Sequence, residues 1–232
     1  KLIFDSAHAF GCKLGDSFLG GFGDAEVFSF HATKVFSTGE GGAITTNSDE
    51  LAAKLRLMRN FGFTHYDKTD HIGTNAKMSE FPAAYGLVNL EQLESVIAHN
   101  QALHKAYLTA FADFPEISFL SYEYNGASNY QYVVARVPAR LRDSLVEFYH
   151  QNHILVRRYF HPGCHRMEPY NSDSRYQAIE LPNTETLASE ILVFPTGSQL
   201  SESDIQDFAL LYGQFIEANQ VKPALSTKPP DD

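Results

Sequence analysis

The sequence predicts an α/β protein built in two parts. Short apolar segments alternate with amphipathic segments in the first part, and shorter strand and helix patterns follow in the second. The 232 residues are 44% hydrophobic, which is enough for one large domain or two small ones. We therefore expect a domain over residues 1–111, a smaller α+β domain over 112–220, and a flexible proline-rich tail over 221–232.

The first part begins with an apolar strand that ends at Asp5, followed by the strand-like segment AEVFSF. The pair Asn47-Ser48 is suited to cap the start of a helix, and Pro82 fits the first turn of a longer one. Apolar residues spaced by three and four support both helices. The expected elements are strands at 2–5, 25–30 and 42–46, helices at 49–60 and 79–111, and a loop at 62–78.

In the second part, β-branched and aromatic residues indicate strands, and an Asn125-Gly126 turn separates two of them. Ser201 and Asp204 have the spacing of a helix N-cap. Residues 161–182 carry two prolines and a glycine and are expected to be irregular. The expected strands are 117–122, 130–137, 154–159 and 191–194. The expected helices are 139–152, a short one that starts at Asn183 or Thr184, and 201–217.

Composition argues against several classes of protein. The formal net charge is -10 and lysine and arginine form no block, so a basic nucleic-acid-binding face is not expected. No apolar run has the length of a membrane span. The two cysteines are too few for a disulfide framework, which favours a cytoplasmic protein.

One short segment, SFHATKVFSTGEGGAIT at residues 29–45, carries the first chemical signal. A strand leads to Lys34, and three glycines follow it. A lysine that forms an imine must spend time uncharged, and partial burial provides for that. The glycines let the backbone approach a ligand closely. The competing interpretation is a surface lysine beside a glycine turn.

Asp5 strengthens the chemical interpretation of Lys34. A carboxylate at the end of a buried strand needs a cationic partner, and a protonated pyridine nitrogen is one. Pyridoxal phosphate pairs such a nitrogen with an acid and binds covalently to a lysine. His8 is positioned to contact the cofactor ring. Alternatively, Asp5 caps the following turn and His8 is an ordinary buried histidine.

A phosphate group would need donors of its own. Ser29, five residues before Lys34, is a candidate. The segment 73–80 leads into a helix, where free backbone N–H groups favour an anion, and Asn75 and Lys77 add side-chain donors. Ordinary helix-entry chemistry is the alternative for these two residues.

The segment HPGCH at residues 161–165 holds three possible metal ligands. Known zinc sites use a second, separated ligand pair at recognisable spacing, and none is present. We therefore expect no metal site.

Five blocks follow one another along the chain: DSAHAFG, GDAEVFSFHATKVFSTGEGGAI, GTNAKMSEFPAAYGL, RRYFHPGCHRMEPY and LVFPTG. Together they resemble the DegT/DnrJ/EryC1/StrS sugar aminotransferases, which are fold type I pyridoxal-phosphate enzymes. The resemblance runs from Lys1 to about Ala218. It implies the C-terminal part of that fold, in which a mixed sheet with flanking helices forms part of the large cofactor-binding domain and a smaller α+β domain follows.

The resemblance also implies roles. Lys34 matches the lysine that holds pyridoxal 5'-phosphate as a Schiff base and then moves protons, Asp5 the acid facing the pyridine nitrogen, and His8 a ring contact. Ser29 matches a phosphate-binding serine. The segment containing Asn75 and Lys77 matches a loop that in this family reaches the phosphate of the neighbouring subunit. Arg158 and Tyr159 belong to a block near the substrate entrance.

The implied reaction transfers an amine, usually from glutamate, to a keto group on a nucleotide-linked sugar. Related dehydratases carry histidine in place of the lysine, so Lys34 favours transamination. Members form homodimers and have a long segment before the strand that ends in Asp5. We therefore expect this chain to be the C-terminal part of such an enzyme. The alternative is a non-catalytic relic that acts as a binding or assembly module.

Overall fold

The computed structural model describes residues 1–121 and 125–219, so the expected flexible tail at 221–232 and the end of the strand expected at 117–122 lie outside the described residues. The chain divides into two compact units. Unit 1 is Lys1–Ala98 with Tyr122–Gln131, and unit 2 is His99–Ser121 with Tyr132–Asp232. The expected division at residue 111 is replaced by one inside a helix, and the segment before Tyr132 returns to unit 1.

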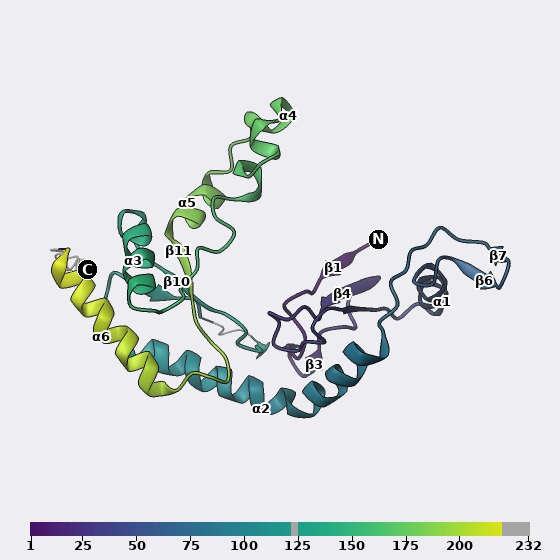
Figure 1. Ribbon diagram of the computed structural model, residues 1–232, viewed down its shortest axis with the longest axis horizontal. Coiled ribbons are helices and arrows are strands. Elements are labelled where there is room, and N and C mark those ends of the chain that lie inside the picture. The colour runs from purple at the N-terminus through teal and green to yellow at the C-terminus, as the bar shows by residue number, and fades with distance from the viewer. Residues whose placement is uncertain (122–124, 220–232) are drawn as a thin grey trace, which may run out of the picture. The chain divides into compact units, whose positions relative to one another are not determined.

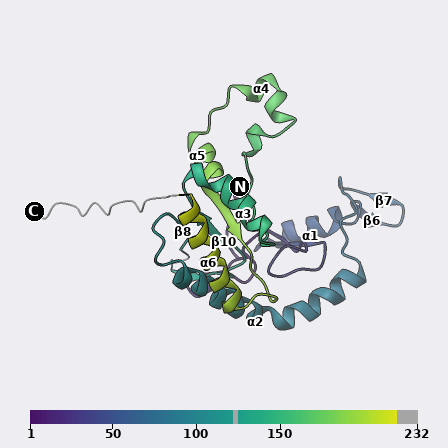
Figure 2. The same ribbon diagram turned by 60° about the vertical axis from the view of Figure 1, so that its left-hand side comes forward.

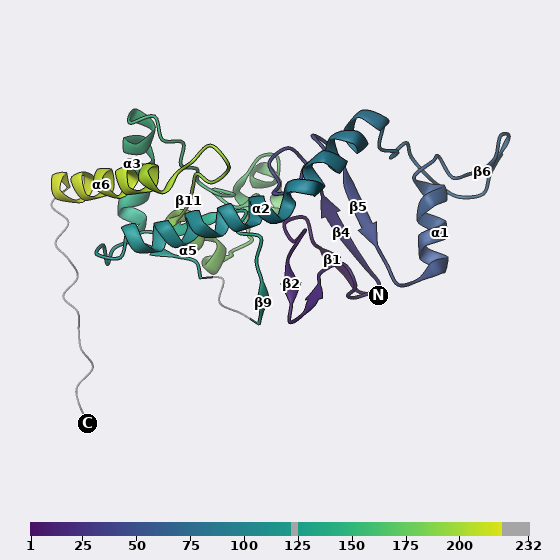
Figure 3. The same ribbon diagram turned by 90° about the horizontal axis from the view of Figure 1, so that it is seen from below.

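A mixed three-stranded sheet forms the centre of unit 1 (Figure 3). Its strands are β1 (Ile3–Asp5), β4 (Ala25–Ser29) and β5 (Gly42–Thr45), in the order β1-β4-β5. β1 and β4 are parallel, with Asp5 opposite Val27, whereas β4 and β5 are antiparallel. The three predicted strands and the mixed character of the sheet are therefore confirmed. Because parallel strands end at the same edge, Asp5 and Ser29 lie at one edge of this sheet.

Two small sheets in unit 1 were not expected. β2 (Lys13–Leu14) pairs with β3 (Ser17–Phe18) and with β9 (Gly126–Ala127), which brings the later segment back to unit 1. The expected loop at 62–78 contains a hairpin of β6 (Phe63–His65) and β7 (Lys68–Thr69), visible at one end of unit 1 in Figure 1. Strands of two or three residues are too short to show a clear alternation in the sequence.

Two helices complete unit 1. α1 (Asp49–Met58) has Ser48 as its N-cap, and the Ser48 hydroxyl accepts a hydrogen bond from the Leu51 N–H. α2 (Glu80–Ala110) continues into unit 2. Its first half keeps large apolar side chains exposed, among them Phe81 and Leu87. None of the described helices is long and apolar enough to cross a membrane.

Unit 2 has an antiparallel sheet covered by helices (Figure 2). Its buried core joins the end of α2 to the sheet and to two amphipathic helices, and includes Leu103, Tyr107, Leu145, Phe194 and Tyr212. A capping box of Ser201 and Asp204 begins the last helix, as its sequence indicated. The elements are β8 (Ser118–Phe119), β10 (Val133–Arg136), α3 (Ala139–Gln151), α5 (Pro182–Glu190), β11 (Ile191–Phe194) and α6 (Glu202–Ala218).

The strand expected at 154–159 is absent. Only Arg157 pairs with β11, through reciprocal backbone hydrogen bonds with Val193, and Phe160 then takes a positive φ of 51° that turns the chain away. The following segment has short 3-10 helices at Cys164–Arg166 and Tyr170–Ser172 and the helix α4 (Ser174–Gln177). It extends away from the sheet of unit 2 in Figures 1 and 2.

The unit 2 core generates a stability prediction. Leu145 is fully buried, and its replacement by alanine removes apolar contacts and leaves a cavity. We expect Leu145→Ala to lower the free energy of unfolding by about 2–5 kcal/mol. Leu210→Ala on α6, where the side chain is 67% exposed, should change it by less than about 0.5 kcal/mol. Urea titrations followed by circular dichroism measure both, and equal effects would contradict the assigned core.

Candidate active site

The carboxyl edge of β1 and β4 supplies the first site residues. Asp5 is exposed, and only its Oδ1 accepts a hydrogen bond within the described chain, from the Ala7 N–H at 3.1 Å. Ser29 ends β4, and its Oγ accepts from the His31 N–H at 3.4 Å. Both interpretations of Asp5 are compatible with this geometry, because it caps its own turn and still presents a second carboxylate oxygen.

Lys34 lies in a loop that leaves the end of β4 and returns to it. The Lys34 N–H donates to the His31 carbonyl at 2.9 Å, and the Thr38 N–H donates to the Phe30 carbonyl at 2.9 Å, which closes the loop. The Lys34 side chain is half-buried and forms no hydrogen bond or ion pair within residues 1–121 and 125–219. Its amine therefore has no competing hydrogen-bond or ion-pair partner among the described residues.

Aromatic rings pack together within and next to this loop. Phe10 stacks on Phe36 with ring centroids 4.6 Å apart, and Phe30 meets Phe36 edge-to-face at 4.7 Å. Phe10 follows Asp5 in the chain, so the same rings join the segment after Asp5 to the loop that carries Lys34. Such a cluster stabilises both segments by burying apolar surface.

The charges of Lys34 and Asp5 both affect the pKa of His8. Burial lowers the pKa of the His8 imidazole, the Lys34 ammonium lowers it further, and the Asp5 carboxylate opposes the shift. Both charges are therefore close enough to affect the same ring. The structure thus brings Asp5, His8 and Lys34 together in unit 1.

His31 stabilises the turn before Lys34. Its Nδ1 accepts a hydrogen bond from the Thr33 N–H at 3.2 Å and lies 2.9 Å from the Thr33 hydroxyl. Its Nε2 lies 3.6 Å from a Glu40 carboxylate oxygen. These contacts join His31 to Thr33 and Glu40 within the same loop, so they stabilise the conformation of that loop.

The glycines after Lys34 make close approaches within the chain itself. A Cβ on Gly42 would lie 2.5 Å from the Phe28 carbonyl oxygen, and one on Gly41 would lie 2.5 Å from the Thr38 hydroxyl. Glycine is therefore required here to pack β5 against β4 and the loop. The sequence indicated that the glycines allow the backbone to approach a ligand closely. In the structure the groups that approach these glycines closely are the Phe28 carbonyl and the Thr38 hydroxyl of the chain itself.

Asn75 and Lys77 contact each other. The Lys77 ammonium donates to the Asn75 Oδ1 at 2.6 Å and lies 4.4 Å from the centre of the Phe61 ring. Among the described residues, neither forms a hydrogen bond or ion pair with Asp5, Ser29 or Lys34. The structure therefore does not join these two residues to the others by any contact.

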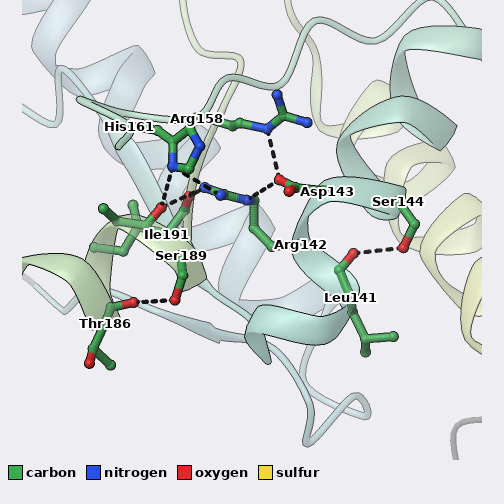
Figure 4. A network of polar contacts seen from close by, with 10 residues as sticks. Leu141, Arg142, Asp143, Ser144, Arg158, His161, Thr186, Ser189 and Ile191 are labelled. Carbon is green, nitrogen blue, oxygen red and sulfur yellow. Dashed lines mark hydrogen bonds and ion pairs between the residues drawn. The ribbon is translucent and has the colours of Figure 1, made fainter. Parts of the chain in front are cut away.

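Arg158 and Tyr159 belong to unit 2. The Asp143 carboxylate accepts hydrogen bonds from the Nε of Arg142 at 2.6 Å and interacts with the Nε of Arg158 at 2.9 Å (Figure 4). The two terminal nitrogens of Arg158 point away from Asp143. Burial and a hydrogen bond with Tyr132 raise the pKa of the Tyr159 hydroxyl, which keeps it a neutral donor.

The buried arginine of this network was not singled out in the sequence. Arg142 is 2% exposed. Its terminal nitrogens lie near the Ala188 carbonyl at 2.7 Å and the His161 Nδ1 at 3.2 Å. A charged residue in an amphipathic helix pattern gives no sign that it faces inward, because its partners lie far along the chain.

The HPGCH residues take separate partners. His161 contacts Arg142, the His165 Nε2 lies 2.9 Å from a Glu185 carboxylate oxygen, and Cys164 is an exposed free thiol. In the described part of the chain, no three His, Cys, Asp or Glu side chains gather as metal ligands.

Known structures share this fold. The structure of DesI with its TDP-sugar product superposes with a TM-score of 0.84 at 39% identity, covering 96% of this chain and 58% of that one. PseC of Helicobacter pylori, an aminotransferase of pseudoaminic acid biosynthesis, superposes with a TM-score of 0.85 at 26% identity, covering 93% and 59%. The fold is that of sugar aminotransferases.

Sequence comparison places the chain within a family. It is 36% identical over 211 residues to a dTDP-4-amino-4,6-dideoxy-D-glucose transaminase of Shigella dysenteriae, covering 90% of this chain and 57% of the relative. It is 31% identical over 215 residues to a GDP-perosamine synthase of Caulobacter vibrioides, covering 88% and 56%. The DegT/DnrJ/EryC1/StrS aminotransferase family model matches residues 1–209, and the chain belongs to that family. It spans somewhat more than half the length of these relatives.

The arrangement of Asp5, His8 and Lys34 can be tested by measuring the pKa of the His8 imidazole. Because the Lys34 charge lowers the His8 pKa, Lys34→Met should raise it, and because the Asp5 charge raises it, Asp5→Asn should lower it further. NMR titration of the His8 ring measures both shifts. Lys54→Met, on the exposed face of α1, is the control and should leave the His8 pKa unchanged. A His8 pKa that fell in Lys34→Met, or rose in Asp5→Asn, would refute this arrangement.

Proposed function

We propose that this chain carries the catalytic lysine of a pyridoxal-phosphate-dependent aminotransferase acting on a nucleotide-linked keto-sugar, with glutamate as the amine donor. The observation that carries the proposal is the shared environment of Lys34, Asp5 and His8 at the edge of the β1–β4 pair. Membership of the aminotransferase family supports it.

The chemistry of these side chains fits the cofactor. Within residues 1–121 and 125–219, Lys34 offers an amine without a hydrogen-bond or ion-pair partner, and Asp5 offers a carboxylate oxygen without one. Ser29 offers a hydroxyl at the end of the neighbouring strand. Pyridoxal phosphate, when bound, supplies an electron sink and carries the amine from donor to acceptor. In this assignment Lys34 holds the cofactor covalently, Asp5 pairs with its ring nitrogen, and Ser29 binds its phosphate.

His8 contributes as a neutral group. Burial and the Lys34 charge both disfavour its protonated form, so near neutral pH the imidazole contacts the ring without adding positive charge. The Lys34 amine would also serve as a general acid/base, because in its uncharged form it can accept a proton and then return it.

Phosphate binding by Asn75 or Lys77 is a separate part of the proposal. Their mutual hydrogen bond leaves the Asn75 amide NH2 and two ammonium protons of Lys77 as donors. Both residues lie on the segment that leads into α2, and the first N–H groups of a helix have no acceptor within the helix itself. Their action on a second subunit, and hence a homodimer, is consistent with the exposed Phe81 and Leu87 of that helix.

The substrate class follows from the relatives and from Arg158. The two relatives are named for dTDP- and GDP-linked sugars, both of which carry a diphosphate. Asp143 contacts Arg158 at Nε, and the terminal nitrogens, which point away from Asp143, would be able to form a bidentate bond to an anion. Tyr159 adds a neutral hydroxyl group. We assign Arg158 and Tyr159 to substrate binding. Because both cysteines are free thiols, we also assign the protein to the cytoplasm.

Addition of pyridoxal phosphate tests the function directly. We expect a near-visible absorbance band that borohydride fixes as a mass increase on the peptide containing Lys34. Lys34→Ala should abolish both signals because no other amine is assigned to the site. Lys54→Ala, on the exposed surface of α1, is the matched control and should retain both.

Adding glutamate then separates two functions. Loss of the band, followed by transfer of the amine to a keto-sugar nucleotide, is the result expected of the enzyme. Stable capture at Lys34 with no amine transfer would instead support a non-catalytic binding module. A wild-type chain that captures no cofactor would overturn the proposal.

Arg158 generates a separate binding prediction. Arg158→Ala should weaken the binding of a nucleoside diphosphate about tenfold or more, because charge-assisted hydrogen bonds to phosphate are lost. Isothermal titration calorimetry measures the affinity. Arg140→Ala, on an exposed part of α3, should leave it unchanged. Equal affinities for all three proteins would remove Arg158 from the substrate site.

A further inference from the structure

The segment at residues 129–131 contacts both the loop that carries Lys34 and the segment that follows Asp5. Asn129 and Gln131 are 3% and 7% exposed, and both belong to unit 1. Tyr130 between them has a positive φ of 50°, a conformation that is uncommon for a large side chain. This geometry turns the segment away from the strand that the sequence predicted over 130–137 and directs both amide side chains to the site loops.

Gln131 anchors the loop that carries Lys34. Its Oε1 accepts a hydrogen bond from the N–H of Val35, the residue directly after Lys34, at 2.8 Å. Because a backbone N–H needs an oxygen acceptor, this bond fixes the orientation of the amide. The Gln131 Nε2 then has no hydrogen-bond partner within the described residues. A buried unpaired NH2 is unfavourable, so this glutamine is not explained by packing alone.

Asn129 anchors the segment that follows Asp5. Its Nδ2 donates to the carbonyl oxygens of His8 at 2.8 Å and Phe10 at 3.0 Å. Its Oδ1 accepts the Gln131 N–H at 3.1 Å, so the two amide side chains are joined through the backbone. All hydrogen-bonding groups of the Asn129 amide except one lone pair are therefore used within unit 1.

We propose that Asn129 and Gln131 are positioning residues that hold the Lys34 loop and the Asp5–Phe10 segment in a fixed relation. They touch the backbone of both segments and not the reactive groups. The covalent attachment at Lys34 depends on the position of the ε-amine relative to Asp5, and a displacement of about 1 Å is enough to slow such chemistry. This inference rests on the proposed function for its chemical consequence, but its structural part does not.

Three variants of the full chain test the anchor. Gln131→Met keeps the side-chain length and removes the acceptor, Gln131→Glu restores an acceptor in either protonation state, and Gln92→Met on the exposed face of α2 is the control. Hydrogen exchange of the Val35 amide, measured by NMR without cofactor, should accelerate about tenfold or more in Gln131→Met, because a lost hydrogen bond eases local opening. It should return toward the wild-type rate in Gln131→Glu and be unchanged in Gln92→Met.

The second readout is borohydride capture of pyridoxal phosphate at Lys34. We expect the concentration for half-maximal capture to rise about threefold to tenfold in Gln131→Met and in Asn129→Asp, which loses both donors to the Asp5–Phe10 segment. Unchanged Val35 exchange would overturn the anchor. Faster exchange with unchanged capture would overturn its role in positioning Lys34. Absence of capture in the wild-type chain would overturn the proposed function instead, and the exchange result would still decide the anchor.

Discussion

The parallel pairing of β1 with β4 is the constraint on which the candidate site depends. Parallel neighbours end at the same edge of a sheet, so the pairing places Asp5 and Ser29 at one edge and starts the Lys34 loop there. The antiparallel return of β5 then closes the loop, and it requires glycine at Gly42 because the Phe28 carbonyl lies where a Cβ would be. The backbone pairing of the strands therefore sets where Asp5, Ser29 and the Lys34 loop lie.

The two units hold their functional residues by different means. Unit 2 has a large apolar core, and its buried cation, Arg142, is satisfied by carbonyl, carboxylate and imidazole groups. The site of unit 1 depends instead on a small aromatic cluster and on single polar contacts from Asn129 and Gln131. Loss of one hydrogen bond should therefore affect the Lys34 loop more locally than loss of a core side chain affects unit 2.

Features governed by local chemistry were predictable from the sequence. The strand ending at Asp5, the cap at Asn47-Ser48 and the Ser201–Asp204 capping box depend on neighbouring residues. Lys34 was singled out as a candidate from the strand before it and the glycines after it. Features governed by distant partners were not. The segment at 154–159 has strand-like residues but pairs with β11 only at Arg157, and the burial of Arg142 depends on carbonyl groups more than forty residues away. The contacts of Gln131 were unpredictable for the same reason.

The Val35–Gln131 hydrogen bond joins positions 96 residues apart, and this separation has a consequence for synthesis on the ribosome. Lys34 and Val35 emerge first, while the Gln131 amide that accepts the Val35 hydrogen bond is still untranslated. At about 5–20 residues per second, roughly 5–20 s pass before that amide is made. During this interval the nascent loop lacks this hydrogen bond, which forms only after the first stretch of unit 2 has been translated.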